Sequence, residues 1–511
     1  MKRRTNETLA DLVTARLEQI NPKAYKIKGM SDVASYIKAN RKRHFFIIGD
    51  YDVDGVMATS IMYKLLSYLK IDVEYYIPHR FSDGYGANPQ IVDLIPDNSV
   101  VIMVDNGIVA FPAVTAAKEK GCNVIILDHH LKAENGEFPD ADFIIDPNAI
   151  DGQCKFTDYC GAGLCYKLAE LMDISESLLE ECSALAAYAT IADVVPLRGE
   201  NWLIASNLDK AYCNTGLNTL LHEMKVEGTP SSDDAGFKVC PAINAPGRLI
   251  DDGATRSLEL MLEDDPAEAE NKAKNLRLRN EERKMLVEIG MNKVEKILAR
   301  DGFDRCIAII TDIHPGIVGI VAGKLAEKYL VPSFVFADAG NGIIKGSART
   351  AGDNHLKKML DSVSDLLTKY GGHAAAAGLS MPIENIEAFR ERIAEISKPV
   401  NIDDMLLYDD EVDQDNFLDA ISEIERAAPY GEGNPPFIFK TSLSINDKRP
   451  YIMLGKYLKL VTNENIDVLC FDEVPDTGAI TTAVDVLGPI SVNEYKGKPI
   501  KQIEAKTLVF N

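Results

Sequence analysis

Three short runs of Phe, Val, Ile, Leu and Met constrain the fold of this chain more than any other feature. They are His44–Ile48 (HFFII), Val100–Val104 (VVIMV) and Asn123–Leu127 (NVIIL). Each run is apolar without alternation, which is typical of strands buried on both faces of a parallel sheet. Helical patterns at Val56–Leu69 and Ala110–Lys120 supply the crossovers that parallel strands need. The first third of the chain is therefore predicted to be an α/β domain.

Each of the three runs leads directly into acidic or histidine residues. In an open parallel sheet, ligands bind outside the carboxyl ends of the strands. Carboxylates gathered there repel one another unless a cation neutralises them, so the pattern indicates a metal site rather than solvent-exposed loops. The residues are Asp50, Asp52 and Asp54 after the first run, Asp105 after the second, and Asp128, His129 and His130 after the third.

The mixture of carboxylates and imidazole favours Mn²⁺ over Mg²⁺, because Mg²⁺ prefers all-oxygen sites. Four or more acidic ligands are enough to hold two ions about 3.5–4 Å apart, an arrangement typical of phosphoryl transfer. His130, beside the ligand candidate His129, is placed to protonate a leaving oxygen or to stabilise charge on a phosphate. Hydrolysis of a phosphoester, with Mn²⁺ or Mg²⁺ as the cofactor, is the predicted reaction.

Two other metal sites are disfavoured by spacing. Asp50–Gly55 (DYDVDG) opens like an EF-hand calcium loop, but the twelfth residue is Ile61 instead of glutamate, and a strand precedes the loop. The nine cysteines contain no CxxC pair, which argues against a zinc site and for a reduced, cytoplasmic protein. We find no signal-peptide pattern and no apolar run long enough to span a membrane, and we expect a monomer.

The net charge of −23 argues against broad, nonspecific attraction to nucleic acid. A local basic groove is still compatible with it, because Asn271–Arg300 carries nine Lys and Arg against four Glu. The alternative is a solvated helix with ion pairs between residues three or four apart. The segment Ala267–Ala299 has no proline, and it is predicted to form one long helix between two lobes.

Four segments of the first 200 residues resemble the four motifs of the DHH phosphoesterases, in order, and more narrowly those of the RecJ-type single-strand exonucleases. They are Asp50–Gly55, Val104–Ile108 (VDNGI), Asp128–His130 and Ala189–Leu197 (ATIADVVPL). The resemblance implies the metal ligands Asp52, Asp54, Asp105, His129 and Asp193, of which Asp193 rests on it alone. It places His130 at the reacting phosphate, and we predict His130 and Asp128 as the catalytic pair.

The chain departs from the family pattern at Pro246 of the NAPGRL segment described below and at one position near the DHH motifs. Many DHH enzymes carry a histidine four residues before the first aspartate of the D-x-D pair, and here that residue is Ile48. We expect Asp50 to supply the missing ligand.

Three segments further along resemble RecJ-type signatures and the DHH-associated substrate-binding domain, namely Asn244–Leu249 (NAPGRL), His314–Gly323 (HPGIVGIVAG) and Gly371–Gly378 (GGHAAAAG). Glycines allow backbone N–H groups to form a phosphate nest, and arginine suits bidentate phosphate contacts. Structural roles are the alternatives: a turn histidine at 373, a helix start at 314 and a tie between lobes at 248. The predicted substrate-binding residues are Arg248, His314, Arg349, Gly371, Gly372 and His373.

The C-terminal part reads as a small all-β module. Turn-rich Pro429–Pro436 precedes several short strand patterns, and Pro429–Pro435 resembles the entry to the OB-fold of RecJ proteins. Basic and aromatic residues alternate within it, which suits a single strand, although a plain barrel with exposed lysines explains them as well. These residues are Lys448, Arg449, Tyr451, Lys456, Tyr457 and Lys459.

The combined prediction is an α/β protein with a parallel-sheet DHH domain (1–215), a connecting region with a long helix (216–300), a second α/β domain (301–400), and a linker with an OB-like barrel (401–511). We predict a metal-dependent exonuclease for single-stranded DNA, working 5′→3′ in repair and recombination, beside a helicase and single-strand-binding protein; polarity and partners follow from the resemblance. The alternatives are a DHH phosphodiesterase of short oligonucleotides or cyclic dinucleotides, and an inert DNA-binding scaffold.

Overall fold

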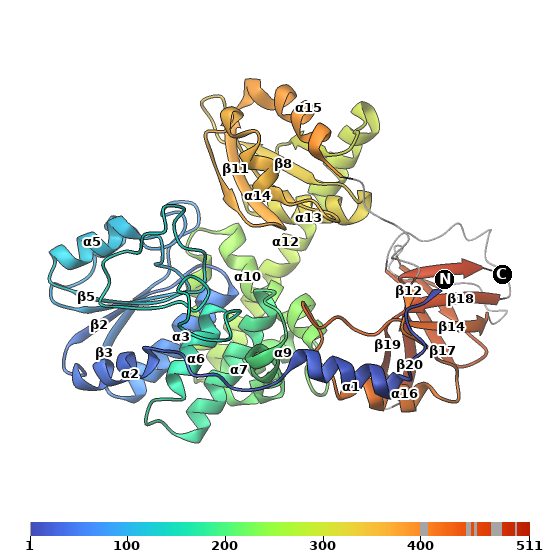
Figure 1. The fold of residues 1–511 in the computed structure, drawn as a ribbon, viewed down its shortest axis with the longest axis horizontal. Coiled ribbons are helices and arrows are strands. Elements are labelled where there is room, and N and C mark those ends of the chain that lie inside the picture. Colours follow the sequence, from blue (N-terminus) through green and yellow to red (C-terminus); the bar gives the residue numbers. More distant parts are fainter. Residues whose placement is uncertain are drawn as a thin grey trace.

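The computed structural model describes residues 2–398, 407–445, 451–453, 457–471, 483–495 and 498–510. Figure 1 shows three bodies: an N-terminal α/β domain on the left, a second α/β domain above, and a β-rich module on the right. The long helix α12 (Pro266–Asp301) rises from the first body to the second. This is the predicted fold class, and the long connecting helix is confirmed.

The N-terminal sheet has five parallel strands in the order β3-β2-β4-β5-β6. The three apolar runs form the neighbouring strands β2, β4 and β5, as predicted. Along β2, Phe45 and Ile47 pack into the core on one face, while Phe46 and Ile48 pack into the core on the other. This two-sided burial explains the unbroken runs. The strands are β2 His44–Ile48, β3 Asp72–Tyr76, β4 Val100–Val104, β5 Asn123–Leu127 and β6 Phe143–Ile145.

Helices cover both faces of this sheet. The face of Phe45 packs against α2 (Met30–Ala39), α3 (Val53–Tyr68), α6 (Gly161–Ala169) and α7 (Glu176–Ala192). The face of Phe46 packs against α4 (Pro89–Asp93) and α5 (Phe111–Glu119). The sequence predicts a helix that begins after Gly161–Gly163, but these three residues form its first turn, so their N–H groups lie at the free end of the helix.

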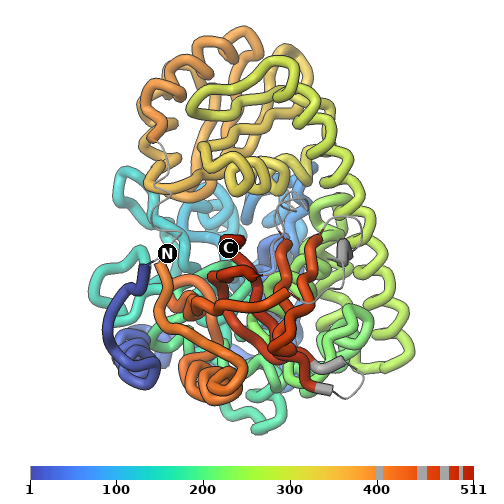
Figure 2. The backbone as a smooth tube through the Cα atoms, turned by 90° about the vertical axis from the view of Figure 1, so that its right-hand side faces the viewer, coloured from blue at the N-terminus to red at the C-terminus, as the bar shows by residue number. Residues whose placement is uncertain are grey.

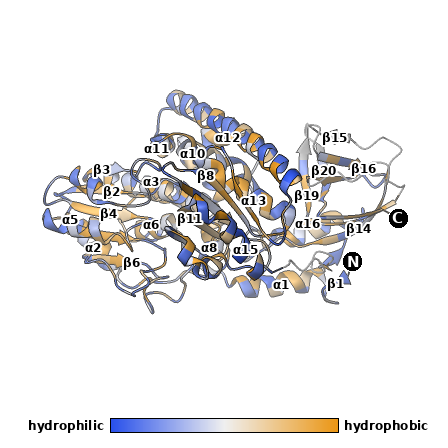
Figure 3. Cartoon of the chain, turned by 90° about the horizontal axis from the view of Figure 1, so that it is seen from above, coloured by the Kyte–Doolittle hydropathy of each residue, from blue (hydrophilic) through white to orange (hydrophobic). Residues whose placement is uncertain are grey.

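A helical region joins the two α/β domains. The basic helix α12 carries ion pairs along its surface, including Arg277 with Glu281 and Arg279 with Glu282, as the solvated-helix interpretation predicts. Hydrophilic and hydrophobic residues alternate along α12 in Figure 3. The preceding elements are α8 Gly199–Ala205, η1 Leu208–Cys213, α9 Thr215–Glu223, the π-helix η2 Asp234–Val239, α10 Cys240–Leu249 and α11 Gly253–Met261.

The second α/β domain contains a mixed sheet in the order β10-β11-β9-β8-β7, in which β7 and β8 are parallel and the other neighbours are antiparallel. Its elements are β7 Ile307–Ile310, η3 Pro315–Ile317, α13 Val318–Tyr329, β8 Ser333–Asp338, β9 Ile343–Arg349, α14 Leu356–Asp361, η4 Ser364–Leu366, β10 Lys369–Gly372, β11 Ala376–Pro382, η5 Ile383–Asn385 and α15 Ile386–Ile396.

Two predictions for this domain are wrong. A helix is expected over His355–Tyr370, but α14 ends at Asp361 and the chain then forms strand β10, because Lys369–Gly372 pairs with β11. Tertiary pairing here overrides local helix propensity. A tight turn is expected at 371–373, but both glycines lie in the ladder. The turn follows them and is closed by the N–H of His373, which donates to the carbonyl of Ala376 at 2.8 Å.

The C-terminal module has two sheets, β13-β14-β18-β21 and β15-β16-β17-β20-β19, around one core. One strand is predicted over 502–509, but the chain crosses from one sheet to the other at Ala505 and Lys506, whose N–H groups donate to Leu469 and Leu487. The elements are β12 Leu407–Tyr408, β13 Asp410–Glu411, α16 Phe417–Glu425, β14 Phe439–Ser444, β15 Tyr451–Met453, β16 Tyr457–Val461, β17 Ile466–Cys470, β18 Ala483–Gly488, β19 Ile490–Tyr495, β20 Lys498–Glu504 and β21 Thr507–Phe510.

Part of the predicted basic and aromatic surface of this module cannot be placed. Lys448, Arg449, Lys456 and the side chain of Tyr451 lie outside the described residues, as does the first part of the predicted linker, 401–406. Lys459 is described, and it forms an ion pair with Asp467 at 2.6 Å.

The N-terminal segment packs against this C-terminal module. Strand β1 (Lys2–Arg3) pairs with β12, and helix α1 (Leu9–Ile20) buries Val13 in the core of the module. Both ends of the chain therefore lie at the module, as Figures 1 and 2 show. The domain limits 1–215, 216–300, 301–400 and 401–511 stay a prediction. In the part of the chain that the structure describes, no helix is both long and apolar enough to cross a membrane.

A buried carboxylate on α8 connects the segment after α1 to Tyr159 and to Lys167 of helix α6. Glu200 accepts the backbone N–H of Tyr25 at 2.9 Å and bonds the Lys167 ammonium and the Tyr159 hydroxyl. Glu200→Ala leaves Lys167 short of a buried partner, so we expect a loss of about 3 kcal/mol of unfolding free energy. Urea unfolding followed by the fluorescence of Trp202, the one tryptophan in the sequence, measures it. Glu137→Ala, at an exposed position, is the control, and equal stabilities of both variants would contradict the expectation.

Candidate two-metal catalytic site

Five carboxylates and a histidine converge at the carboxyl edge of the N-terminal sheet. Asp52 caps helix α3, where its Oδ1 accepts the N–H of Gly55 at 3.1 Å, and Asp54 lies in the first turn. Asp105 follows β4 with φ 58°, a left-handed conformation that few non-glycine residues adopt. Asp193 follows α7, at its C-cap. With Asp50, which follows β2, the edge thus brings together side chains that are up to 143 residues apart in the sequence, from Asp50 to Asp193.

Asp54 is held by the N-terminus of helix α6. Its two carboxylate oxygens accept the N–H groups of Gly161 at 2.6 Å and Ala162 at 2.7 Å. The helix dipole favours a negative charge at this position. Gly161 also lets α6 approach, since a Cβ there would lie 2.6 Å from the Cβ of Asp105. Gly161 and Ala162, which the sequence predicts to lie just before the helix, therefore belong to the site itself.

His129 lies at the centre of the carboxylates. Its Nε2 is 3.1 Å from an oxygen of Asp105, 3.6 Å from Asp54 and 3.7 Å from Asp193. The structure therefore brings Asp193 to the cluster, although only the family resemblance predicts it there. Burial and the neighbouring His130 lower the pKa of His129, which favours the neutral ring that a metal ligand requires.

Asp50 has an unsatisfied oxygen. Its side chain is buried, and among the described residues its Oδ1 has no hydrogen-bond partner. Burial, and then the charge of Asp52, raise the pKa of Asp50. Ile48 is fully buried in the apolar core, so it offers no ligand to this edge. A buried carboxylate oxygen without a partner is costly, and a cation is the partner that its surroundings lack.

Other members of the cluster are strained electrostatically in the same way. Burial raises the pKa of Asp105 and of Asp193, and in both cases the charge of Asp54 is the next cause. Carboxylates this close cannot all ionise unless positive charge is added. The residues present therefore fit divalent cations.

Among the described residues, three groups of possible ligands emerge from the distances; in the group of Asp105, His129 and His130 the Nδ1 of His130 is bonded to Asp128, so the other two groups are the candidate ligand sets. Atoms of Asp54, His129 and Asp193 lie within 4.8 Å of one another, and so do oxygens of Asp50, Asp52 and Asp105. One set is nitrogen and oxygen, and the other is all oxygen, a mixture that suits Mn²⁺.

His130 is held as a cation between two groups. Its Nδ1 donates to Asp128 at 2.7 Å, and its Nε2 lies 2.9 Å from the hydroxyl of Tyr85. Burial is the largest single effect and lowers the pKa of His130, but the hydrogen bond with Asp128 and the charges of the surrounding aspartates together raise it to about 9. Burial would raise the pKa of Asp128, yet the same bond and the imidazole charges lower it to about 2. Asp128 also accepts the N–H of Ile108, so its oxygens are occupied and its geometry is that of a positioning residue.

Four arginines meet beside the carboxylates. Burial, and then the charges of Arg80, Arg283 and Arg349, lower the pKa of Arg248 to about 10. Among the described residues none of the four has a carboxylate partner within 4.0 Å; Arg80, for example, donates to the carbonyl of Gly247. Like charges gathered without a partner indicate an anion site, and guanidinium groups fit a phosphate.

Small residues of the second domain let the arginines meet. A Cβ on Gly316 would lie 1.8 Å from the carbonyl oxygen of Arg248, and one on Gly319 would lie 3.2 Å from Nη2 of Arg349. Gly316 therefore lets the second domain approach α10, and Gly319 leaves room for the Arg349 side chain within the second domain.

The remaining predicted substrate residues are placed unequally. His314 caps η3, where its Nδ1 accepts the N–H of Gly316 at 3.1 Å, so the structural alternative has direct support. His373 lies near the site, because the charge of His130 is among the causes that lower its pKa, after burial. Gly372 has φ 139° and a Cβ there would lie 2.4 Å from the carbonyl of Ala376, so the hairpin itself requires glycine. A phosphate nest at Gly371 and Gly372 stays a prediction.

Several residues at the site are absent from the predicted set. Arg80 follows β3, so the strand-end rule that identifies the aspartates would have found it as well. Its guanidinium lies 3.8 Å from the ring centre of Tyr51. Asn106 fastens two strand ends by donating to the carbonyls of Ile48, Gly49 and Val104. Nothing in the sequence singles out Tyr85.

Comparisons with known proteins agree with this geometry. Residues 44–191 match the N-terminal domain of the DHH family, 304–398 match the DHHA1 domain, and 408–507 match the RecJ OB domain. A single-stranded-DNA-specific exonuclease RecJ of Salmonella typhimurium is 30% identical, over 89% of this chain and 86% of its own length. The chain belongs to the RecJ family. The RecJ of Bacillus subtilis is 32% identical over 94% of this chain, which spans 63% of that longer protein.

Solved structures show the same fold and the kind of ion. RecJ from Thermus thermophilus in complex with Mn²⁺ is 27% identical, with a TM-score of 0.81 over 98% of this chain and 76% of that one. The same protein in complex with Mg²⁺ is 27% identical and gives a TM-score of 0.76, over 98% and 74% of the two chains. Both RecJ complexes contain ions that we predict for the carboxylate cluster.

Asp50 is expected to lower the stability of the metal-free protein and to raise its affinity for Mn²⁺, and one substitution tests both effects. Asp50→Asn removes one buried like charge, so we expect the metal-free protein to melt at a higher temperature than the wild type. The same change removes a ligand, so the affinity for Mn²⁺ should fall by about tenfold or more. Thermal unfolding and calorimetric Mn²⁺ titration measure these two quantities. A variant with unchanged Mn²⁺ affinity would contradict the assignment of Asp50, and Asp97→Asn, at an exposed aspartate, is the control.

Proposed function

We propose that this chain is a metal-dependent exonuclease that hydrolyses phosphodiester bonds of single-stranded DNA. The observation that carries the proposal is the position of the carboxylate–histidine cluster beside the arginine cluster, in a chain of the RecJ family. The first cluster suits catalysis on a phosphate, and the second suits binding of another phosphate of the same strand. The cofactor is Mn²⁺ or Mg²⁺, the ions found in the RecJ structures.

The ligands that we propose are Asp54, His129 and Asp193 for one ion and Asp50, Asp52 and Asp105 for the other. When bound, divalent cations supply Lewis-acid activation of water and of the phosphate. The protein places the reacting groups: Asp128 holds His130 by Nδ1, which leaves Nε2–H directed to the hydroxyl of Tyr85 at 2.9 Å. From that position the proton on Nε2 can be donated to a phosphate or leaving-group oxygen.

The arginine cluster supports 5′→3′ polarity. A terminal phosphate carries more negative charge than an internal phosphodiester, so Arg80, Arg248 and Arg349 favour a phosphorylated strand end. Hydrolysis that breaks the bond between phosphorus and O3′ leaves a 5′-phosphate on the shortened strand. Each cycle would then regenerate the group that the arginines bind, which suits digestion from the 5′ end.

The alternative functions have less support. An inert scaffold would not need to keep six metal-ligand candidates together within a few ångströms. A phosphodiesterase for dinucleotides has no evident use for a third module, and residues 408–507 match the RecJ OB domain. We further propose, from the family resemblance alone, a role in repair and recombination with a helicase and single-strand-binding protein. The nine free cysteines support a reducing, cytoplasmic location, and we keep the monomer as a proposal.

A degradation assay tests the activity. With Mn²⁺, the wild type should release mononucleotides from a single strand whose 3′ end is blocked and spare a strand whose 5′ end is blocked. Asp52→Ala and His129→Ala should each reduce the rate by more than about 100-fold, since even residues behind metal ligands cost 10–100-fold. Asp97→Ala is the control at an exposed aspartate. Intact long strands together with rapid cleavage of a dinucleotide would support the alternative enzyme instead.

The arginine cluster has its own test. Arg349→Lys keeps the charge but loses the planar fork, so the KM for a 5′-phosphorylated strand should rise by about tenfold. The KM for the same strand with a 5′-hydroxyl should change much less. Steady-state kinetics on both strands give the ratio, with Arg300→Lys, at an exposed position on α12, as the control. Equal changes in KM for both strands would contradict a role of Arg349 in recognising the 5′-phosphate.

A further inference from the structure

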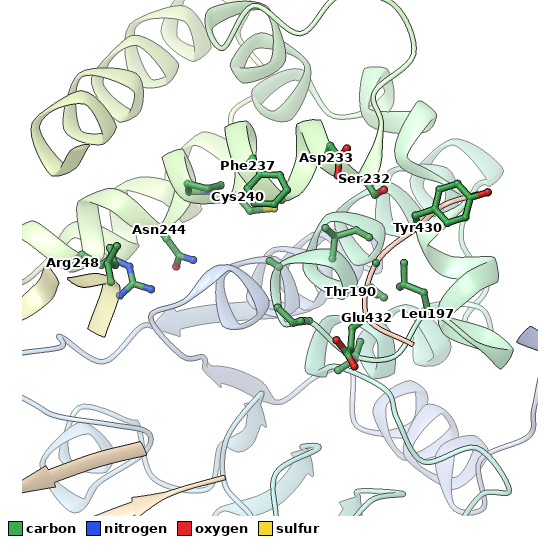
Figure 4. A pocket seen from close by; sticks show the side chains of 18 of the residues that line it. Thr190, Leu197, Ser232, Asp233, Phe237, Cys240, Asn244, Arg248, Tyr430 and Glu432 are labelled. Atoms are coloured by element: carbon green, nitrogen blue, oxygen red, sulfur yellow. The ribbon is translucent and has the colours of Figure 1, made fainter. Parts of the chain in front are cut away.

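A cavity of about 360 Å³ lies beside the metal cluster, and neither ligand set uses it. It extends along α10 and η2, above the segment that follows Asp193. In Figure 4, Arg248 and Asn244 lie at one end, and Tyr430, Leu197 and Glu432 lie toward the other. Its volume lies within the range of about 300–1,000 Å³ that is usual for sites of small organic ligands. One end thus borders the proposed phosphate site, and the other faces the C-terminal module.

The end near the catalytic cluster is basic and polar. Arg248 and Arg283 both line it, from α10 and α12. Asn244 lines it as well, and its Oδ1 is buried without a hydrogen-bond partner among the residues that the structure describes. Two guanidinium groups next to an unsatisfied amide fit a ligand that carries a phosphate and further polar groups.

The middle of the cavity exposes apolar side chains. Phe237 is 76% exposed, although a large apolar ring gains by burial. It lies on the π-helix η2, a rare element that is frequent at functional sites. Val194 is 62% exposed and has φ 57°, which is a true outlier for a β-branched residue. Strained residues persist mainly where a site requires them, and Val194 directly follows the metal-ligand candidate Asp193.

The far end is acidic, with Asp233 and Glu432 in the lining. Carboxylates repel phosphate, so a bound nucleotide has one favourable direction, with its phosphate at the arginines. Carboxylates can also accept N–H groups of a nucleobase. The charges at the two ends of the cavity and the ring of Phe237 between them therefore favour the same orientation of a bound nucleotide.

On the basis of the proposed function, we propose that this cavity binds one nucleotide of the single strand next to the scissile bond. Its base lies against Phe237 and Val194, and its phosphate lies at Arg248 and Arg283. Stacking on an aromatic ring tolerates every base, which suits an enzyme that must degrade any sequence. Phe237 is then a residue that positions the strand for cleavage.

The C-terminal module completes this site. The N–H of Leu197 donates to the carbonyl of Glu432 at 2.7 Å, and a Cβ on Gly431 would lie 2.9 Å from Cδ1 of Leu197. Residues 430–432 thus form a wall of the cavity and are fixed to the segment that follows Asp193. The module contributes directly to the nucleotide site, in addition to any strand binding on its own surface.

Binding to strands with a single missing base tests the proposal. In the Asp52→Asn background, which prevents cleavage, we compare 5′-phosphorylated oligonucleotides with an abasic site moved one position at a time from the 5′ end. One position near the end should weaken binding by about tenfold, the usual scale for one stacked base. In Phe237→Ala, that position should no longer matter, while the effects of the other positions stay the same.

Matched variants keep the test independent of folding. Phe237→Leu retains an apolar side chain without the ring and should behave like Phe237→Ala. Tyr212→Ala, at a 66% exposed aromatic that does not line the cavity, should keep the wild-type abasic profile. An unchanged abasic profile in Phe237→Ala would overturn the proposal. That result is distinct from failure of the proposed function, in which wild-type protein with Mn²⁺ would leave single strands intact.

Discussion

Repulsion among carboxylates at the edge of the parallel sheet is the constraint on which the rest of this structure depends. Asp50, Asp54 and Asp105 are buried, and burial together with the charges of neighbouring aspartates raises the pKa values of Asp50 and Asp105. The fold offsets part of this cost with the N-terminus of α6, which bonds both oxygens of Asp54. The remainder requires cations, so the same residues that would destabilise a metal-free domain create a strong preference for divalent ions.

The second constraint is that the guanidinium groups of the arginines and the metal-binding carboxylates must stay apart until a substrate phosphate lies between them. The arginines come from the segment after β3, from α10, from α12 and from β9, so no single domain contains the phosphate site. Helix α12 connects the two domains, and Gly316 permits close contact between the second domain and Arg248 of α10. A strand of DNA bound between the domains would neutralise the arginines and place its backbone at the metal ligands. The proposed phosphate site therefore depends on how the two domains are arranged.

Strain is concentrated where the chain leaves regular elements at the site. Asp105 and Val194 both adopt left-handed conformations, immediately after β4 and just beyond α7. Such conformations cost of order 1–3 kcal/mol each and persist when surrounding contacts fix them. Here the fixing contacts come from distant parts of the chain: Gly161 against Asp105, and residues 430–432 against the segment after Val194. The C-terminal module is therefore connected mechanically to a metal-ligand candidate.

The sequence by itself determined the parallel sheet and the metal cluster at its edge. Unbroken apolar runs indicate strands that are buried on both faces, and the end of each run marks the end of its strand. Asp52, Asp54, Asp105 and His129 follow these ends, so they could be identified from the sequence around each run. Tertiary structure decided what depends on pairing between distant segments. Strand β10 forms in place of a predicted helix because it pairs with β11, which the more distant strand β9 holds in the sheet, and Gly371 and Gly372 lie within this pairing. The arginine cluster and the cavity at Phe237 exist only where separate domains meet, and no local pattern encodes such a distance.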